Sequence, residues 1–183
     1  MNFICLEFNH SLCIIIDGRE IMKVATFNAN SIRSRLPIII DWIKENKPDV
    51  LGIQETKVQN VDFPESIFNE MGYHVCFEGE KSYNGVAIIS KEKPVEIISG
   101  FDDGGPADKT RLICAKFNKF LVINTYIPQG RAIDHIMFKY KLSWYKRLKE
   151  FISKYLEDNK SIAWIGDMNL SLIHISEPTR PLE

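Results

Sequence analysis

The amino-acid sequence predicts a mixed α/β (α+β) domain in which helices and sheets pack as layers. Three observations support this class. Short β-rich segments recur along the chain, two segments show helical periodicity, and the pattern of Val50–Gln54 is continuous rather than alternating, as expected for a strand inside a sheet. Helices mixed with parallel and hairpin-connected strands are typical of an α/β or α+β sandwich. No internal repeat or flexible linker divides the chain.

The first half of the chain alternates between strands and helices. Lys23–Asn28 has a strand pattern, and the helix that follows is expected over Leu36–Asn46, because Pro37 suits a first helical turn. Pro48 and Asp49 end this helix ahead of the apolar strand Val50–Gln54. A short helix over Pro64–Met71 ends at Gly72.

The second half is dominated by strands and one long helix. Strands are expected at residues 73–77, 85–90, 95–98, 112–117, 120–125 and 162–166, with Asn118 and Lys119 at a hairpin tip. The long helix runs from Asp134 to about Asp158. Its buried face is predicted from apolar residues at helical spacing, namely Met137, Tyr140, Trp144, Leu148, Phe151 or Ile152, and Tyr155. Its solvated face is predicted to carry Lys139, Lys141, Lys146, Arg147 and Lys149, with DNA contact as the less favoured reading.

Composition excludes several classes of protein. The chain has 183 residues, of which 45% are hydrophobic and 26% charged, which is too apolar for a disordered protein. Its net charge of −1 shows no global basic surface, so any nucleic-acid contact must come from a local patch. Cys5, Cys13, Cys76 and Cys114 have no metal-binding spacing, which favours reduced thiols of a cytoplasmic protein. No apolar run is long enough for a membrane span, and no secretory signal is recognised.

The two ends differ in character from residues 22–169. Residues 1–21 precede Met22, and we interpret them as a non-native extension, with an additional strand over Leu12–Ile16 as the alternative. Residues 170–183 continue neither helix nor strand and resemble a sequencing-adapter read-through. They are therefore set aside, together with His174, in the assignment of function.

Polar side chains follow the predicted core strands at the points where those strands end. Asn28 ends the first strand, Gln54-Glu55-Thr56-Lys57 ends the second, Asn124-Thr125-Tyr126 ends a later one, and Gly166-Asp167-Met168-Asn169 ends the last. In layered α/β folds, sites are built at strand ends. Each residue alone has a structural explanation, such as a turn cap for Asp167 and Asn169 or a surface ion pair for Glu55 with Lys57.

Taken together, these groups suit a hard divalent cation. Carboxylate and amide oxygens favour Mg²⁺, with Mn²⁺ as an alternative, over Zn²⁺. A cation at Glu55 would polarise a phosphodiester, Asp167 would orient or deprotonate water, and Asn169 and Tyr126 would donate to phosphoryl oxygens.

The sequence resembles the exodeoxyribonuclease III family of the endonuclease/exonuclease/phosphatase superfamily. The resemblance covers residues 22–169 and is carried by motifs in the same order, namely Phe27–Arg33, Gln54–Lys57, Gly85–Ala87, Asn124–Gly130 and Gly166–Asn169. It implies a four-layer αββα sandwich, incomplete in this chain, and a Mg²⁺-dependent abasic-site endonuclease and 3′–5′ exonuclease of base-excision repair. The implied partner is double-stranded DNA with abasic sites or 3′ blocks, bound by a monomer. Lys81–Ala87 and Pro128-Gln129-Gly130 favour this DNA-repair branch over other phosphodiesterases.

The resemblance also implies roles for individual residues. It assigns metal binding to Glu55, Asn28, Asp167 and Asn169, and catalysis to Asp167, Asn169 and Tyr126. It assigns DNA-backbone contact to the following residues: Asn30, Arg33, Lys57, Tyr83, Asn84, Gln129 and Arg131.

The chain departs from the family pattern after Asn169. Family members continue with a late Asp and a terminal Ser-Asp-His block, which are absent here. We therefore expect little phosphodiesterase activity from this polypeptide and an exposed apolar face that favours aggregation. The alternatives are another phosphodiesterase of the superfamily, a non-catalytic nucleic-acid-binding module, or an inert fragment.

Overall fold

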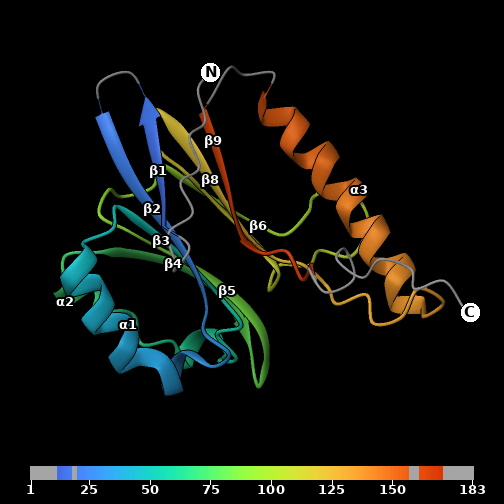
Figure 1. Cartoon of the computed structure of the whole chain (residues 1–183), viewed down its shortest axis with the longest axis horizontal. Coiled ribbons are helices and arrows are strands. Elements are labelled where there is room, and N and C mark those ends of the chain that lie inside the picture. Colours follow the sequence, from blue (N-terminus) through green and yellow to red (C-terminus); the bar gives the residue numbers. More distant parts are fainter. Residues whose placement is uncertain (1–11, 18–19, 157–160, 171–183) are drawn as a thin grey trace, which may run out of the picture.

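A computed structural model describes residues 12–17, 20–156 and 161–170 of the chain, and for residues 12–17, 20 and 21 the backbone alone. Figure 1 shows two β-sheets that face each other, with helices on the outer sides. The first sheet has the order β1-β2-β3-β5-β4 and the second β6-β7-β8-β9. The mixed α/β class and its four layers are thus confirmed.

The first sheet contains β1 (Leu12–Asp17), β2 (Glu20–Asn28), β3 (Val50–Gln54), β4 (His74–Glu80) and β5 (Tyr83–Ser90). Helices α1 (Ile32–Asn46) and α2 (Glu65–Glu70) and the 3-10 turn η1 (Asn60–Asp62) connect its strands. The second sheet contains β6 (Glu96–Ser99), β7 (Leu112–Lys116), β8 (Phe120–Tyr126) and β9 (Ser161–Asp167), with α3 (Ile136–Leu156) between β8 and β9.

Three apolar layers hold the four structural layers together. Ile39, Ile43 and Phe68 pack α1 and α2 on the first sheet. Between the sheets lies a second layer that includes Val86, Ile113, Val122 and Ile165. Trp144, Leu148 and Phe151 of α3 cover the outer side of the second sheet. These buried faces confirm the apolar stripe expected for the long helix at Trp144, Leu148 and Phe151.

Two parallel strand pairs bring polar strand ends to one end of the sandwich. Strand β2 pairs with β3 in a register that places Asn28 opposite Gln54. Strand β8 pairs with β9 so that Tyr126 lies opposite Asp167. Because parallel strands end on the same side, each sheet presents its polar termini together.

Helix α1 begins at Ile32, earlier than the sequence pattern indicated, so Pro37 lies inside the helix. The missing Pro37 N–H leaves only the Arg33 carbonyl without its usual helical donor. Arg33 is exposed, so water can satisfy that carbonyl. The expected first turn at Leu36 was therefore wrong, because a proline is tolerated where the helix faces solvent.

Strand β1 forms at the edge of the first sheet and pairs antiparallel with β2, with Leu12 opposite Ala25 and Asp17 opposite Glu20. The additional strand considered as an alternative for this segment is therefore present. Whether residues 1–21 are a non-native extension before Met22 stays a prediction. The tail after Leu170 lies outside the described residues.

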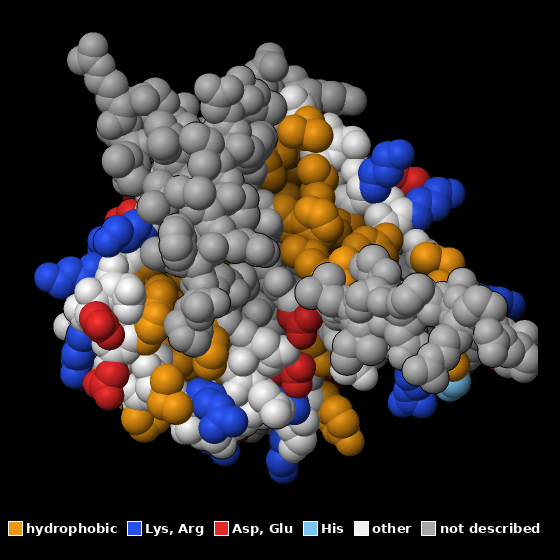
Figure 2. All heavy atoms as spheres, viewed as in Figure 1, with side chains coloured by type: hydrophobic (Ala, Val, Ile, Leu, Met, Phe, Trp, Pro, Cys, Tyr) orange, Lys and Arg blue, Asp and Glu red, His pale blue; other side chains and the backbone are white. Residues whose placement is uncertain are grey.

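Large apolar side chains are exposed in several places. Figure 2 shows hydrophobic side chains gathered on one face of the molecule. Among the described residues, Phe27, Ile38 and Trp164 keep 37%, 58% and 40% of their surface exposed. The expected tendency to aggregate stays a prediction that these residues motivate. None of the helices in the described part of the chain has the length and apolar character needed to cross a bilayer.

Candidate active site

The side chains of Asn28, Glu55 and Asp167 meet at one end of the sandwich. The Asn28 amide Nδ2 donates to Glu55 Oε1 at 2.8 Å and to Asp167 Oδ2 at 2.7 Å. Glu55 directly follows β3 of the first sheet, whereas Asp167 ends β9 of the second. The two carboxylates predicted to share a cation are therefore neighbours across the gap between the sheets.

The orientation of the Asn28 amide is fixed by its oxygen. Oδ1 accepts a hydrogen bond from the backbone N–H of Asn30 at 3.0 Å, so Nδ2 must face the carboxylates. The backbone around it is also held, because Ala29 N–H donates to the Gln54 carbonyl at 2.9 Å and Ser31 N–H donates to the Glu55 carbonyl at 2.8 Å. This loop therefore presents Asn28 in a set position.

Lys57 supplies positive charge beside Glu55. Its Nζ lies 2.9 Å from Glu55 Oε2 and also bonds the Asn30 side-chain oxygen. Burial raises the pKa of Glu55, but hydrogen bonds from Asn28 and Lys57, the Lys57 charge and the Tyr126 hydroxyl together lower this pKa below its usual range. Glu55 is therefore held ionised, as a metal ligand must be.

Tyr126 lies beside Glu55 and under a guanidinium. Only 9% of its surface is exposed, and Arg111 Cζ lies 4.8 Å from its ring centroid. Burial, the Glu55 charge and the hydrogen bond to Glu55 raise the pKa of Tyr126 to about 12, with Arg111 acting in the opposite direction. The phenol is therefore a neutral hydrogen-bond donor at physiological pH.

The segment Gly166–Asn169, here termed the Asp167 turn, fixes the second carboxylate. Asn169 N–H donates to Asp167 Oδ1 at 2.8 Å, and the Asn169 side-chain amide donates to the Ile127 carbonyl at 2.6 Å. Ile127 N–H donates to the Asp167 carbonyl at 3.0 Å. The turn is thus tied to the loop after β8.

Several residues of this end adopt left-handed backbone conformations that cost energy for non-glycine residues. Positive φ values occur at Asn30 (43°), Glu55 (52°), Lys57 (54°), Asn84 (44°) and Asn169 (49°). Such residues persist only where the surrounding structure determines them, and they concentrate at functional sites. Their grouping around Glu55 and Asp167 supports the assignment of this end as the site.

The donor set fits a hard divalent cation. The two carboxylates and the Asn169 side-chain oxygen are donors of the kind that Mg²⁺ uses together with retained water, whereas Asn28 presents its N–H group to both carboxylates. Within the described residues, no group of three or more His, Cys, Asp or Glu forms a metal cage.

Of the residues predicted to contact DNA, Asn30 and Lys57 lie at this site. Asn30 and Lys57 bond each other next to Glu55. Asn84 follows the β4–β5 hairpin tip, its carbonyl accepts from Lys57 N–H at 2.9 Å, and Tyr83 beside it is 70% exposed. Gln129 and Arg131 are exposed in the loop after β8. Arg33 pairs with Asp62 at 3.2 Å on the first turn of α1.

Some strand-end polar residues turn out to be structural. Gln54 and Asn124 are buried between the sheets, where Gln54 Nε2 donates to Asn124 Oδ1 at 2.5 Å. Asn124 Nδ2 donates to the carbonyls of Ile53 (3.0 Å) and Ala87 (2.8 Å). They tie the sheets together below the site rather than facing a substrate.

The sequence interpretation of α3 was wrong at two positions. Lys141 was expected on the solvated face, but it is 8% exposed and its Nζ donates to the Asn169 carbonyl at 2.6 Å. Burial lowers the pKa of Lys141, while the Asp167 charge raises it. Arg147 was also expected in solvent, but it pairs with Asp103 (2.7 Å) and Asp108 (2.8 Å). The burial of Lys141 could have been predicted from its spacing, because it lies four residues after Met137 and three before Trp144, on the apolar stripe of the helix.

Arg111 was also overlooked. It directly precedes β7, and besides its place over the Tyr126 ring it donates to the Tyr126 carbonyl at 3.3 Å. Nothing in its local sequence marks it, because its position depends on the pairing of β7 with β8.

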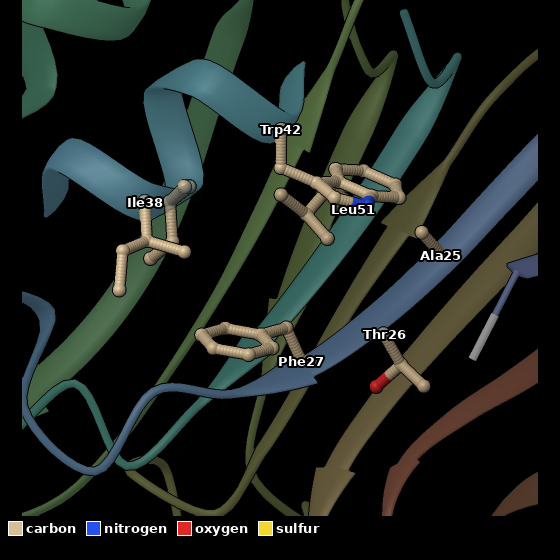
Figure 3. A pocket seen from close by; sticks show the side chains of 7 residues that line it. Ala25, Thr26, Phe27, Ile38, Trp42 and Leu51 are labelled. Atoms are coloured by element: carbon tan, nitrogen blue, oxygen red, sulfur yellow. The ribbon is translucent and has the colours of Figure 1, made fainter. Parts of the chain in front are cut away.

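An apolar cavity of about 200 Å³ lies beside α1 (Figure 3). Its lining includes Phe27, Ile38, Trp42 and Leu51, with Thr26 as the single polar side chain. None of the described residues that line this cavity is ionisable. The polar cluster at Glu55 and Asp167, which brings two carboxylates together, is the candidate active site.

Comparison with known proteins gives a consistent set of relatives. The model of the Endonuclease/Exonuclease/phosphatase family matches residues 25–176. Exodeoxyribonuclease III of Haemophilus influenzae is 36% identical over 155 residues, which cover 82% of this chain and 58% of that protein.

Solved structures that resemble this chain are of the same kind as these relatives. An AP endonuclease from Archaeoglobus fulgidus has a TM-score of 0.78 and 52% identity, covering 81% of this chain and 58% of that one. A 3′ phosphatase, NExo, from Neisseria bound to product DNA hairpin has a TM-score of 0.73 and 35% identity, covering 81% and 58%. The chain thus spans less than two thirds of the length of these relatives.

Proposed function

This chain belongs to the Endonuclease/Exonuclease/phosphatase family, and we propose that it carries the metal-binding part of a site that hydrolyses DNA phosphodiester bonds. The observation that carries the proposal is the Asn28 amide, which bonds Glu55 and Asp167 from opposite sheets at 2.8 and 2.7 Å. Such convergence of oxygen donors, at strand ends and beside a neutral phenol, suits phosphoryl chemistry better than a structural role.

In this proposal Glu55, Asp167 and Asn169 hold Mg²⁺, with Mn²⁺ as a substitute, and Asn28 joins them by turning its amide so that Oδ1 leaves the Asn30 N–H. When bound, the ion would polarise the scissile phosphate and stabilise the departing alkoxide. Glu55 suits the principal ligand because its surroundings lower its pKa and keep it ionised.

Asp167 is proposed to orient and deprotonate the attacking water. Each of its oxygens accepts one hydrogen bond, from Asn169 N–H and from Asn28 Nδ2, so lone pairs remain for a water molecule. The fixed direction of both bonds would place this water reproducibly.

Tyr126 and Asn169 are proposed to stabilise charge on the phosphoryl oxygens. Tyr126 keeps its proton because its pKa is raised to about 12, and with substrate bound it would turn its single O–H from Glu55 to a phosphoryl oxygen. Asn169 uses one N–H for the Ile127 carbonyl and retains a second.

The proposed substrate is double-stranded DNA with abasic sites or 3′ blocks. Asn30 and Lys57 lie next to Glu55 and would contact the DNA backbone, as would Tyr83, Asn84, Gln129, Arg131 and Arg33. The names of the similar proteins, an exodeoxyribonuclease, an AP endonuclease and a 3′ phosphatase bound to DNA, support DNA as the substrate class. A monomeric state and a cytoplasmic location stay predictions.

The test measures metal binding first and hydrolysis second. Mn²⁺ titrated into the purified chain should lose its free-ion EPR signal, and Glu55→Gln and Asp167→Asn should weaken binding about tenfold or more. Glu45→Gln, an exposed carboxylate on α1, is the matched control. Equal Mn²⁺ affinity in wild type and Glu55→Gln would remove the proposed site.

Hydrolysis should be measured on a substrate panel with Mg²⁺, and the rate is expected to be low for this polypeptide. The panel contains a duplex with an abasic site, a duplex with a 3′ phosphate, and a simple non-nucleotide phosphodiester. Preference for either duplex would support the DNA-repair proposal. Preference for the simple diester would favour another phosphodiesterase of the family.

A further inference from the structure

Helix α3 donates two hydrogen bonds to the main chain of the Asp167 turn. Lys141 Nζ donates to the Asn169 carbonyl at 2.6 Å, and the Tyr145 hydroxyl donates to the Met168 carbonyl at 2.9 Å. Lys141 and Tyr145 are four residues apart, so they lie on one face of the helix. Lys141 Nζ is also 6.0 Å from the centroid of the Tyr145 ring. The two side chains therefore act on the same short segment.

The position of Lys141 is unusual for a lysine. The residue is 8% exposed, whereas lysines are rarely buried because the loss of hydration is costly. Its stem lies against Gly130, where an added Cβ would be 3.3 Å from Lys141 Cδ and 3.1 Å from Phe138 Cδ2. The loop after β8 thus leaves room for this side chain to pass.

The bond from Lys141 reaches the residue whose N–H orients Asp167. Asn169 has a left-handed backbone (φ 49°), and its N–H donates to Asp167 Oδ1 at 2.8 Å. Such a conformation is unfavourable unless neighbouring groups hold it. By fixing the Asn169 carbonyl, Lys141 holds this conformation and with it the direction of the N–H.

We propose that Lys141 and Tyr145 are positioning residues that set the Asp167 carboxylate toward Asn28 and Glu55. Neither residue touches the reacting atoms in this proposal; both act through the backbone of the Asp167 turn. The consequence for metal binding rests on the proposed function above. The consequence for the conformation of the Asp167 turn is independent of that function. The positioning role and the proposed function can therefore be tested separately.

The first measurement is amide hydrogen exchange of the whole chain by NMR. Lys141→Met keeps the stem and removes the donor, and it should speed exchange of the Asn169 amide about tenfold or more, since a charged hydrogen bond is lost. Lys141→Arg should restore the wild-type rate to within about threefold, because it retains a cationic donor. Tyr145→Phe should speed exchange to a smaller extent. Lys146→Met, at an exposed position of the same helix, should have no effect.

The second measurement is Mn²⁺ affinity by EPR. Lys141→Met should weaken binding about tenfold, the range typical for groups that orient metal ligands, with Lys141→Arg close to wild type. Core amides of β8 report whether each variant remains folded. If Lys141→Met changes neither Asn169 exchange nor Mn²⁺ affinity, the positioning role is wrong. If wild type binds no Mn²⁺ but Asn169 exchange responds as described, the proposed function fails and the positioning role stands.

Should Lys141→Met not fold, Tyr145→Phe and Lys141→Arg decide the matter. The proposal expects Asn169 amide exchange to stay near the wild-type rate in Lys141→Arg, which keeps a cationic donor, and to become faster in Tyr145→Phe, which loses the hydroxyl. The opposite pair of results, fast exchange in Lys141→Arg and wild-type exchange in Tyr145→Phe, would overturn the proposal.

Discussion

Replacing Asn124 with leucine should destabilise the protein strongly, although leucine has nearly the same size. Asn124 is fully buried, and its amide makes three hydrogen bonds, to the carbonyls of Ile53 and Ala87 and from Gln54 Nε2. A net contribution of about 1–1.5 kcal/mol for each of the three bonds predicts a loss of about 3–4.5 kcal/mol. That is a large part of the stability of a domain of this size, typically about 5–15 kcal/mol.

Tight packing at this position leaves little room for relaxation. A Cβ at Gly52 would lie 3.0 Å from Asn124 Cγ and 2.6 Å from Ile165 Cδ1, so the strands approach closely here. The partner groups therefore cannot move to find new partners, and each lost bond should leave an unsatisfied buried group.

The assay is urea unfolding followed by tryptophan fluorescence. Asn69→Leu, at an exposed position of α2, is the control and should change the unfolding free energy by no more than about 0.5 kcal/mol. If Asn124→Leu and Asn69→Leu unfold within about 1 kcal/mol of each other, the buried amide network contributes little and the reasoning is refuted.

Three further changes test other parts of the structure. Asn28→Ala removes the bridge between Glu55 and Asp167, so Mn²⁺ affinity by EPR should fall about tenfold, and unchanged affinity would argue against Asn28 as part of the site. Gly85→Ala should cost about 2–4 kcal/mol in urea unfolding, because its φ is +97° and the new Cβ would lie 2.0 Å from Thr56 Oγ1. Gly72→Ala is the control, because Gly72 also has a positive φ but an added Cβ would meet no atom there, and it should cost only about 1 kcal/mol. If both variants lose the same unfolding free energy, the structure around Gly85 relaxes enough to remove the clash with Thr56. Since the pKa of Tyr126 is raised to about 12 in the folded protein, the folded state holds its proton more tightly. Stability should therefore fall as pH rises from about 10 to 12, and this fall should be smaller in Tyr126→Phe.

Strand positions could be read from the sequence because their patterns are local. Val50–Gln54 was expected from its continuous apolar run and forms β3 with the same bounds. The meeting of Asn28 with Glu55 was also predictable, since parallel strands end on one side of a sheet, whereas the place of Asp167 beside them depends on how the second sheet packs on the first. The resemblance to a known family strengthened that expectation.

What escaped prediction depends on tertiary position. Asn124 and Tyr126 lie on the same face of β8, but Asn124 is two residues deeper and therefore lies between the sheets instead of at the site. Lys141 has the helical spacing of a buried residue and the chemistry of an exposed one, and only the nearby Asn169 carbonyl explains its burial. Sequence patterns do not show such an acceptor, because it lies 28 residues away along the chain.

The bridge formed by Asn28 spans two separate β-sheets, and this has a thermodynamic consequence. The carboxylates that flank it belong to layers that can slide or part only if the bridge breaks. A cation held by both carboxylates would link the layers in the same place, so its binding free energy would add to the cohesion of the sandwich. Melting temperature should thus rise with divalent-ion concentration, and heat or denaturant that loosens the contact between the layers should weaken ion binding in equal measure.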